Sequence, residues 1–241
     1  MKHYMYRSKL QYHARRAVKI IPSLFNRVVK KGIFTFDLIP TFFKRASFVY
    51  SDADYVRNST LELVSREIHE QQIPGAVAEL GVFRADFAKL INEAFPDRTL
   101  YLFDTFGGFS CEDIRGDESE GKAADEEHFS DTSVSLVLSK MKYPENCIVK
   151  EGYFPDTFTS DIEDPFAFVS IDFDLYQPIY KGLDIVWDHL SPGGYIMIHD
   201  YQNTMFPGSK RAVRQFCEER CLQLVPLSDT NGSALIVKHK Y

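Results

Sequence analysis

Five short apolar runs in this sequence end in acidic or histidine side chains. The residues are Glu79, Asp104, Glu151, Asp172, and His199 with Asp200. If the runs are parallel strands of one sheet, their carboxyl ends meet at one edge, where ligands bind in such folds. Carboxylates gathered there repel one another and lose hydration unless something compensates them. The pattern therefore predicts a site for a cationic ligand, a hydroxyl-rich ligand or a metal ion.

The first run, Ala76–Leu80, leads into a tight turn at Gly81 and then into an amphipathic segment. A strand, turn and helix of this kind present backbone N–H groups that form a natural anion site. Asp104 follows about 20 residues later, where dinucleotide-binding folds hydrogen-bond a ribose. The turn lacks the second glycine of G-x-G-x-x-G, which lets the backbone approach a pyrophosphate. An NAD-dependent oxidoreductase therefore remains an alternative, but a disfavoured one.

Asp172 and the pair His199-Asp200 end strands that should be neighbours. Carboxylate and imidazole groups clustered in this way can hold a divalent ion. A hydroxyl group bound to that ion has a lowered pKa and is a better nucleophile. Simpler interpretations stay open: Asp172 can cap the following segment, Asp174 can be the functional acid, and His199 can be structural.

The elements that must position these side chains alternate along the chain. We expect helices over residues 58–71 (with a cap at 58 or 59), 84–95, 133–140, 177–190 and 210–220, and strands over 76–80, 99–103, 147–150, 166–171 and 195–198. Such alternation predicts a mostly parallel sheet with helices on both faces. Two closing strands, over 221–226 and 233–238, can form a hairpin that adds one antiparallel strand. The sequence thus predicts a seven-stranded, Rossmann-like α/β fold.

The 241 residues suffice for one α/β domain with additions. We expect a basic N-terminal extension with helical stretches over residues 1–58 and a single domain over 59–241. Residues 105–131 are rich in glycine and acidic side chains, with little periodicity, so we expect an acidic loop that acts as a lid. His128 in this loop is a candidate acid/base or substrate-contact residue.

The charge of the chain is distributed unevenly. Residues 1–36 hold nine Lys or Arg and no acid, which leaves 19 of the 28 basic residues against all 34 acidic ones in the remainder. A basic arm on an acidic body suits an anionic surface, an acidic partner subunit or the body itself, and a solvated or packing arm is equally compatible.

Composition also excludes several classes. No run of about 18 apolar residues occurs, so we expect no membrane span. The four cysteines lack zinc-ligand spacing, and the N-terminus makes a poor export signal. We therefore expect a reducing, cytoplasmic setting.

Four motifs carry a resemblance to a known family. VAELGVFRADFAKLINEAFPDRTLYLFDTFGGF, EGYFPDT, FVSIDFDLYQPIYKGL and LSPGGYIMIHDY occur in that order within Ser59–Phe216. They resemble the macrocin O-methyltransferase (TylF/MycF) family, and their order is also similar to that of the catechol and caffeoyl-CoA O-methyltransferases. The resemblance implies the class I methyltransferase fold and an S-adenosylmethionine- and metal-dependent O-methyltransferase acting on sugar hydroxyls.

The resemblance also implies roles for single residues. Glu79 and Gly81 then contact the methionine part of S-adenosylmethionine, Asp104 holds its ribose, and Glu151-Gly152 lies near the adenine. Asp172 and Asp200, with His199 beside them, then coordinate the metal, and Asp172 or His128 lies near the reacting hydroxyl.

The chain departs from the family pattern at two positions. Ala85 stands where the family commonly has glycine, and His199 stands where the family usually has the first aspartate of an Asp-Asp pair. Histidine removes one negative charge, which weakens Mg²⁺ binding and favours Mn²⁺ or softer ions, or makes the metal dispensable.

We therefore expect a methyltransferase for the hydroxyl group of a nucleotide sugar, a glycan precursor or a glycosylated metabolite. The alternatives are a methyltransferase for a phenolic small molecule, the NAD-dependent oxidoreductase, and a non-catalytic partner that retains the fold. We expect a homo-oligomer and no nucleic-acid partner.

Overall fold

The computed structural model describes residues 54–110, 113–114 and 129–240. The predictions made for residues 1–53, for most of the acidic loop and for His128 lie outside the described residues. None of the described helices is long and apolar enough to cross a bilayer.

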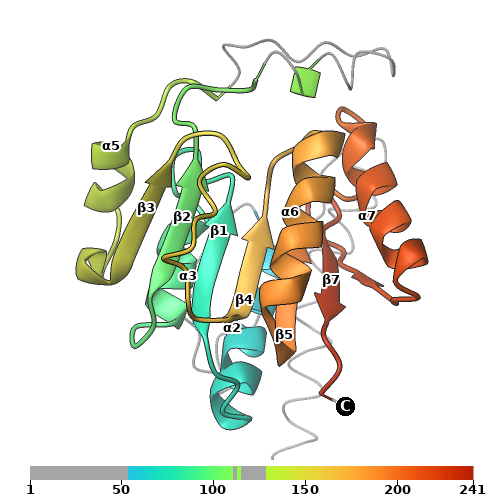
Figure 1. Ribbon diagram of the computed structural model, residues 1–241, viewed down its shortest axis with the longest axis horizontal. Helices are drawn as coiled ribbons and strands as arrows, with labels where there is room; N and C mark the ends of the chain where they lie inside the picture. The colour runs from blue at the N-terminus through green and yellow to red at the C-terminus, as the bar shows by residue number, and fades with distance from the viewer. Residues whose placement is uncertain (1–53, 111–112, 115–128, 241) are drawn as a thin grey trace, which may run out of the picture. The chain divides into compact units, whose positions relative to one another are not determined.

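The described residues build a seven-stranded sheet with the order β3-β2-β1-β4-β5-β7-β6 (Figure 1). The strands are β1 (Ala76–Leu80), β2 (Leu100–Asp104), β3 (Cys147–Glu151), β4 (Phe166–Ile171), β5 (Leu190–Ile198), β6 (Val225–Pro226) and β7 (Ala234–Val237). Strands β1 to β5 pair in parallel, whereas β7 is antiparallel to both β5 and β6. This arrangement confirms the predicted sheet. The strand order reverses between β1 and β4, which is where such sheets bind ligands.

Helices cover both faces of this sheet. They are α2 (Tyr55–Glu70), α3 (Ala88–Ala94), α5 (Val134–Ser139), α6 (Tyr176–His189) and α7 (Pro207–Glu219), with a 3₁₀ turn at Pro144–Asn146. Side chains alternate along β1 because successive residues of a strand point to opposite faces. Ala78 and Leu80 share a core with α6 and α7, while Val77 shares one with α2 and α3. In Figure 1, α6 lies in front of the sheet.

Helix α2 begins earlier than its predicted cap. It starts at Tyr55, so Asn58 and Ser59 lie inside the helix and are buried. The predicted core positions Leu61, Val64 and Ile68 are buried, as expected for a stripe at this spacing. The proposed boundary between extension and domain therefore falls within a continuous helix.

Strand β5 is longer than predicted because it includes the expected turn over residues 192–194. Phe166 pairs with Leu190 and Phe168 pairs with Tyr195. The chain therefore advances by five residues along β5 where it advances by two along β4. The Pro-Gly-Gly segment is therefore accommodated as a bulge within the strand. Gly193 has a φ of +84°, which glycine adopts without strain.

Candidate functional site

A cavity of about 430 Å³ opens at the carboxyl ends of β1, β2, β4 and β5. Five of the predicted site side chains line it, and these are Glu79, Asp104, Asp172, His199 and Asp200. Gly81 and Gly152 also line it, whereas the side chain of Glu151 is exposed and is not among the lining residues. The sheet edge thus gathers the groups that the strand-end pattern predicted, apart from Glu151 on the outermost strand.

The turn after β1 is held by Asp104. Its Oδ2 accepts hydrogen bonds from the backbone N–H groups of Val82 (2.7 Å) and Phe83 (2.8 Å). Its Oδ1 accepts one from the N–H of Phe106 (2.7 Å). The carboxylate thus occupies the anion site that the turn was expected to offer an external ligand. A carboxylate has about four acceptor positions, so one more donor, such as a ligand hydroxyl, can be accommodated.

Gly81 is required where it stands. Its φ is +84°, and a Cβ at this position would lie 2.1 Å from the carbonyl oxygen of Asp172. Two following residues, Phe83 and Ala85, also have positive φ, of 46° and 61°. Such angles are incompatible with a regular right-handed helix, so α3 begins at Ala88 rather than at the predicted residue 84.

Ala85→Gly is expected to leave the free energy of unfolding within about 1 kcal/mol of wild type. Ala85 is fully buried. Removing its buried methyl group destabilises the fold by about 1 kcal/mol, and the greater flexibility of the unfolded chain at glycine destabilises it by a further roughly 0.5–1 kcal/mol. Glycine adopts the left-handed backbone conformation without strain, which stabilises the fold by about 1–2 kcal/mol. Ala212→Gly in the middle of α7, also fully buried, lacks that relief and is expected to cost about 2 kcal/mol. Urea unfolding of both variants measures the difference, and equal losses would contradict the argument.

Glu79 lies on the floor of the cavity with an unsatisfied carboxyl group. Its exposed fraction is 2%, and Oε2 has no hydrogen-bond partner within the part of the chain that the structure describes. Burial raises its pKa well above the usual value, Asp172 and Asp104 raise it further, and Arg57 opposes the shift. A ligand ammonium group or another donor placed here would satisfy Oε2.

The far side of the cavity holds a closed set of ion pairs. His199 Nδ1 lies 2.9 Å from Oδ1 of Asp172 and 3.1 Å from Oδ2 of Asp200. Arg57 Nη2 lies 3.1 Å from Oδ2 of Asp172. Asn203 Nδ2 donates to Oδ1 of Asp200 at 2.9 Å. Each oxygen of the two carboxylates therefore faces an N–H donor.

These contacts determine the charges of the groups. Burial lowers the pKa of His199, but hydrogen bonds and attraction to Asp172 and Asp200 outweigh it and raise the pKa to about 9. Burial raises the pKa of Asp172, but His199 and Arg57 more than reverse this and hold it below its usual value. At neutral pH His199 is therefore an imidazolium between two carboxylates.

Asp174 behaves differently from its neighbours. It is 7% exposed, and burial together with a hydrogen bond to Asp200 raises its pKa well above the usual value. Asp200 shifts the other way: burial raises its pKa, but hydrogen bonds with His199 and Asp174 more than reverse this and lower it. Asp174 and Asp200 both have positive φ, of 61° and 55°. The sequence left Asp174 open as a functional acid, and the structure places it in the cavity wall.

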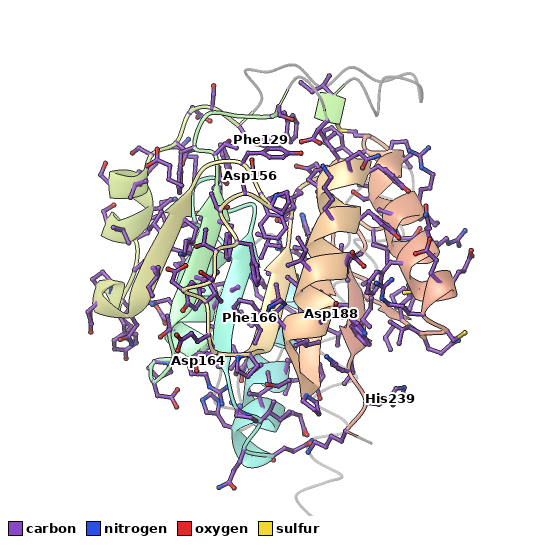
Figure 2. The ribbon with its side chains drawn as sticks, in the orientation of Figure 1. Phe129, Asp156, Asp164, Phe166, Asp188 and His239 are labelled. Atoms are coloured by element: carbon purple, nitrogen blue, oxygen red, sulfur yellow. The ribbon has the colours of Figure 1, made fainter. Side chains whose placement is uncertain are left out.

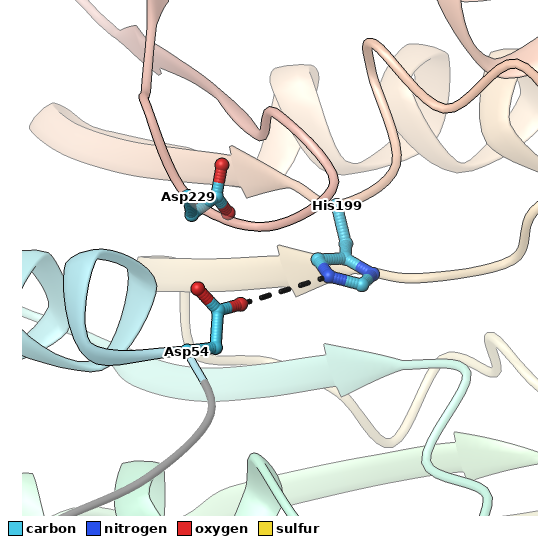
Figure 3. Close-up of side chains that lie close together, drawn as sticks. All are labelled: Asp54, His199 and Asp229. Atoms are coloured by element: carbon cyan, nitrogen blue, oxygen red, sulfur yellow. Dashed lines mark ion pairs between the residues drawn. The ribbon is translucent and has the colours of Figure 1, made fainter. Parts of the chain in front are cut away.

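The other ring nitrogen of His199 faces a second pair of carboxylates (Figure 3). Its Nε2 lies 4.0 Å from Oδ2 of Asp54, and Asp229 is beside them in the turn between β6 and β7. Burial and the nearby charge of Asp229 raise the pKa of Asp54. His199 therefore joins the start of α2, the end of β5 and the last turn of the sheet.

The residues of the predicted metal site do not fit a divalent ion. By residue type, two groups of three side chains could hold one: Asp172, His199 and Asp200, or Asp54, His199 and Asp229. In the first group Nδ1 of His199 already lies 2.9 Å from Oδ1 of Asp172 and 3.1 Å from Oδ2 of Asp200, and a histidine offers one nitrogen where a magnesium site prefers oxygens. Arg57 adds a fixed positive charge at the same carboxylate. The second group shares the same ring, and Asp229 already accepts hydrogen bonds from Ser233.

The outer wall of the cavity is aromatic. The ring centroid of Phe109 lies 5.4 Å from that of Phe129 and 6.2 Å from that of Phe206, and the centroid of Phe83 lies 5.0 Å from that of Phe129. Figure 2 shows Phe129 at the carboxyl edge of the sheet. Aromatic faces of this kind pack against apolar surfaces of a ligand.

A polar group lies in the same wall. Asp113 is 5% exposed and accepts hydrogen bonds from the hydroxyls of Ser110 (2.7 Å) and Tyr153 (2.9 Å). Asp113, Ser110 and Tyr153 all line the cavity. The wall thus combines stacking surfaces with a fixed polar group, as small-molecule sites do.

Arg57 is the site residue that sequence reasoning missed. It lies on α2, before the first strand, and is 6% exposed. Its guanidinium stacks 3.9 Å over the ring of Phe87, and its Nη2 is also 3.4 Å from the hydroxyl of Ser170. A signal existed, because Arg57 shares the helical spacing of the buried positions Leu61 and Val64. An arginine on an apolar stripe implies a buried partner of opposite charge.

The sequence and the structure both match known proteins. A family model described as macrocin O-methyltransferase (TylF) matches residues 44–236. Demethyldecarbamoylnovobiocin O-methyltransferase of Streptomyces niveus is 27% identical over 155 residues, covering 60% of this chain and 58% of that protein. Mycinamicin III 3''-O-methyltransferase of Micromonospora griseorubida is 27% identical over 157 residues, covering 60% and 61%. The matches thus span about 60% of the length of these curated relatives.

Two solved structures share the fold. The O-methyltransferase NovP has a TM-score of 0.65 and 21% identity, covering 76% of this chain and 79% of that chain. The calicheamicin methyltransferase CalS11 has a TM-score of 0.61 and 18% identity, covering 75% and 78%. At these identities the match establishes the arrangement of strands and helices.

Proposed function

This chain belongs to the macrocin O-methyltransferase (TylF) family and has the class I methyltransferase fold, and from that premise we propose that it transfers a methyl group from S-adenosylmethionine to a hydroxyl group of a sugar. The acceptor is a nucleotide sugar, a glycan precursor or a glycosylated metabolite. The activities of two relatives support a sugar-bearing acceptor: the mycinamicin enzyme is a 3''-O-methyltransferase, and a Streptomyces olivaceus relative acts on a rhamnosyl-tetracenomycin.

One observation carries the proposal: the unsatisfied Glu79 and the Gly81 turn open into the same cavity as Asp104 and the aromatic wall. S-adenosylmethionine has an ammonium group, a sulfonium and a ribose diol. Glu79 suits the ammonium group, and the remaining acceptor position of Asp104 suits a ribose hydroxyl. Gly152 lines the cavity beside them and is the proposed adenine contact, with Glu151 contributing backbone only.

Bound S-adenosylmethionine supplies an electrophilic methyl group on a sulfonium. In the transfer, the acceptor oxygen forms a bond to the methyl carbon while the carbon–sulfur bond breaks and a neutral thioether departs. The hydroxyl proton must also leave, and we assign its acceptance to the Asp172 carboxylate, which lines the cavity in its ionised form. His128 stays a candidate for the same task. No step runs through a metal ion, because the residues at the predicted metal site do not fit one.

Two alternatives are less well supported. An NAD-dependent oxidoreductase needs the N–H groups of the first turn for a pyrophosphate, but those of Val82 and Phe83 already bind the Asp104 carboxylate. A non-catalytic partner has no use for an unsatisfied carboxyl group in an open cavity. A phenolic acceptor fits the aromatic wall as well as a sugar does, so the assay must include one.

Calorimetry of the full chain with S-adenosylhomocysteine is expected to show one site per chain. A panel of nucleotide sugars, glycan fragments and catechol, incubated with S-adenosylmethionine, is then expected to give a methylated sugar, detected by mass spectrometry. No binding of S-adenosylhomocysteine or S-adenosylmethionine would overturn the proposal. Methylation of catechol with no methylation of any sugar would assign the phenolic alternative.

A further inference from the structure

We propose that two side chains of this protein, Arg57 and His199, take the place of a divalent metal ion at the end of β4 and β5, so that the site works without metal. This inference deepens the proposed function and rests on it for its meaning in methyl transfer. Metal binding itself can be measured whether or not the methyl acceptor is known.

Arg57 is built into the site rather than lying loosely beside it. Its side chain is 8% exposed, its guanidinium stacks on Phe87, and Nη2 contacts both Asp172 and Ser170. Nη2 is 3.1 Å from Oδ2 of Asp172, which is the oxygen that His199 leaves free. A guanidinium keeps its charge at every working pH. The first carboxylate of the predicted metal site therefore has a permanent cation bound to it.

His199 occupies the space between the two carboxylates. One nitrogen, Nδ1, is within 3.1 Å of an oxygen on each of Asp172 and Asp200. The family's usual aspartate would place an anionic oxygen here, whereas this chain places an imidazole nitrogen, which magnesium binds less well.

The two carboxylates already have N–H partners without an added ion. Arg57 pairs with Asp172, and Nδ1 of His199 lies within 3.1 Å of an oxygen on both Asp172 and Asp200. A divalent ion would add two positive charges next to a fixed guanidinium. Like charges at such short range are strongly unfavourable in a poorly hydrated site. The acceptor hydroxyl is therefore oriented by carboxylates whose charge the protein neutralises itself.

Manganese titration of the chelator-treated full chain tests the inference. Wild type is expected to show no saturable binding of Mn²⁺ by calorimetry or by electron paramagnetic resonance up to about 1 mM. The double variant Arg57→Met/His199→Asp, which removes both cations and supplies the missing oxygen, is expected to bind one Mn²⁺ per chain at least about tenfold more tightly than wild type.

The matched controls are not among the residues that line the cavity. Arg214→Met and His239→Asp make the same changes at exposed positions, and Figure 2 shows His239 near the opposite end of the molecule. Both are expected to bind Mn²⁺ no better than wild type. Circular dichroism verifies folding, and the single variant His199→Asp replaces the double variant if the latter does not fold.

Two results would overturn the inference. One is binding of one Mn²⁺ per wild-type chain that is lost in Asp172→Asn. The other is a folded double variant that binds no Mn²⁺, since the two cations would then not be what excludes the ion. Failure of the wild-type chain to bind S-adenosylhomocysteine would instead count against the proposed function. Once an acceptor is identified, wild-type methyl transfer is expected to be unchanged by EDTA.

Discussion

Asp104→Ala is expected to lower the free energy of unfolding by about 3 kcal/mol and to weaken binding of S-adenosylhomocysteine at least about 100-fold. The stability loss follows because Asp104 accepts hydrogen bonds from the N–H groups of Val82, Phe83 and Phe106, which lose their charged partner. The affinity loss is larger than one missing ligand contact would give, since the turn that shapes the cavity is released as well. Urea unfolding and calorimetry measure the two effects.

Two variants separate these contributions. Asp104→Asn keeps the shape of the side chain and one acceptor oxygen. Its stability and its affinity for S-adenosylhomocysteine should therefore fall between those of wild type and those of Asp104→Ala. Asp156→Ala removes an exposed carboxylate near the same edge of the sheet (Figure 2) and should change neither quantity. An Asp104→Ala protein as stable as wild type would show that the turn does not depend on this carboxylate.

Raising the pH from 6.5 to 9 is expected to reduce the free energy of unfolding by about 2.5 kcal/mol through His199 alone. The pKa of His199 is raised from 6.5 to about 9 in the folded protein, so the folded state holds the proton more tightly. The stabilisation is complete below the unfolded pKa and disappears as the pH rises through the folded pKa. Urea titrations at several pH values measure how steeply the free energy of unfolding falls with pH.

The contribution of His199 can be isolated with one variant. Glu79 and Asp174 also have raised pKa values, so their contributions likewise fall with rising pH and stay present in every variant that keeps them. The slope of wild type minus that of His199→Gln therefore reports on His199 together with the carboxylates that it pairs with, Asp172 and Asp200. His239→Gln at an exposed position is the control. Parallel stability curves for wild type and His199→Gln would refute the assigned ion pairs.

The strands were predictable because each is an apolar run with a polar end. The ends of β1 to β4 fall within one residue of the expected positions, and their side chains meet at one edge as parallel pairing requires. Glu151 failed to enter the cavity because β3 is the outermost parallel strand. Helix α3 was predicted too long because positive φ values at Phe83 and Ala85 leave no mark in hydrophobic periodicity.

The charge pairing at the site could not be read from the sequence. Arg57 reaches Asp172 across 115 positions of the chain, and only the packing of α2 against the sheet brings them together. The family resemblance assigned Asp172, His199 and Asp200 to a metal site because these positions match the family's motif. A resemblance of residue types does not show which other side chains pair with them in this protein. The roles proposed for Glu79, Asp104 and Gly152 in cofactor binding stay predictions that the experiments above address.

The far end of the sheet has a consequence for self-association. Strand β6 is only two residues long, and one of them is Pro226, which has no N–H to offer a further strand. Among the described residues, β3 at the opposite side is the longer edge strand, and Ile148 on it is 41% exposed. Two copies paired through β3 would use up that edge in both. The strands then left at the two ends of the joined sheet would be the two-residue β6 strands, which are poor templates for a further strand.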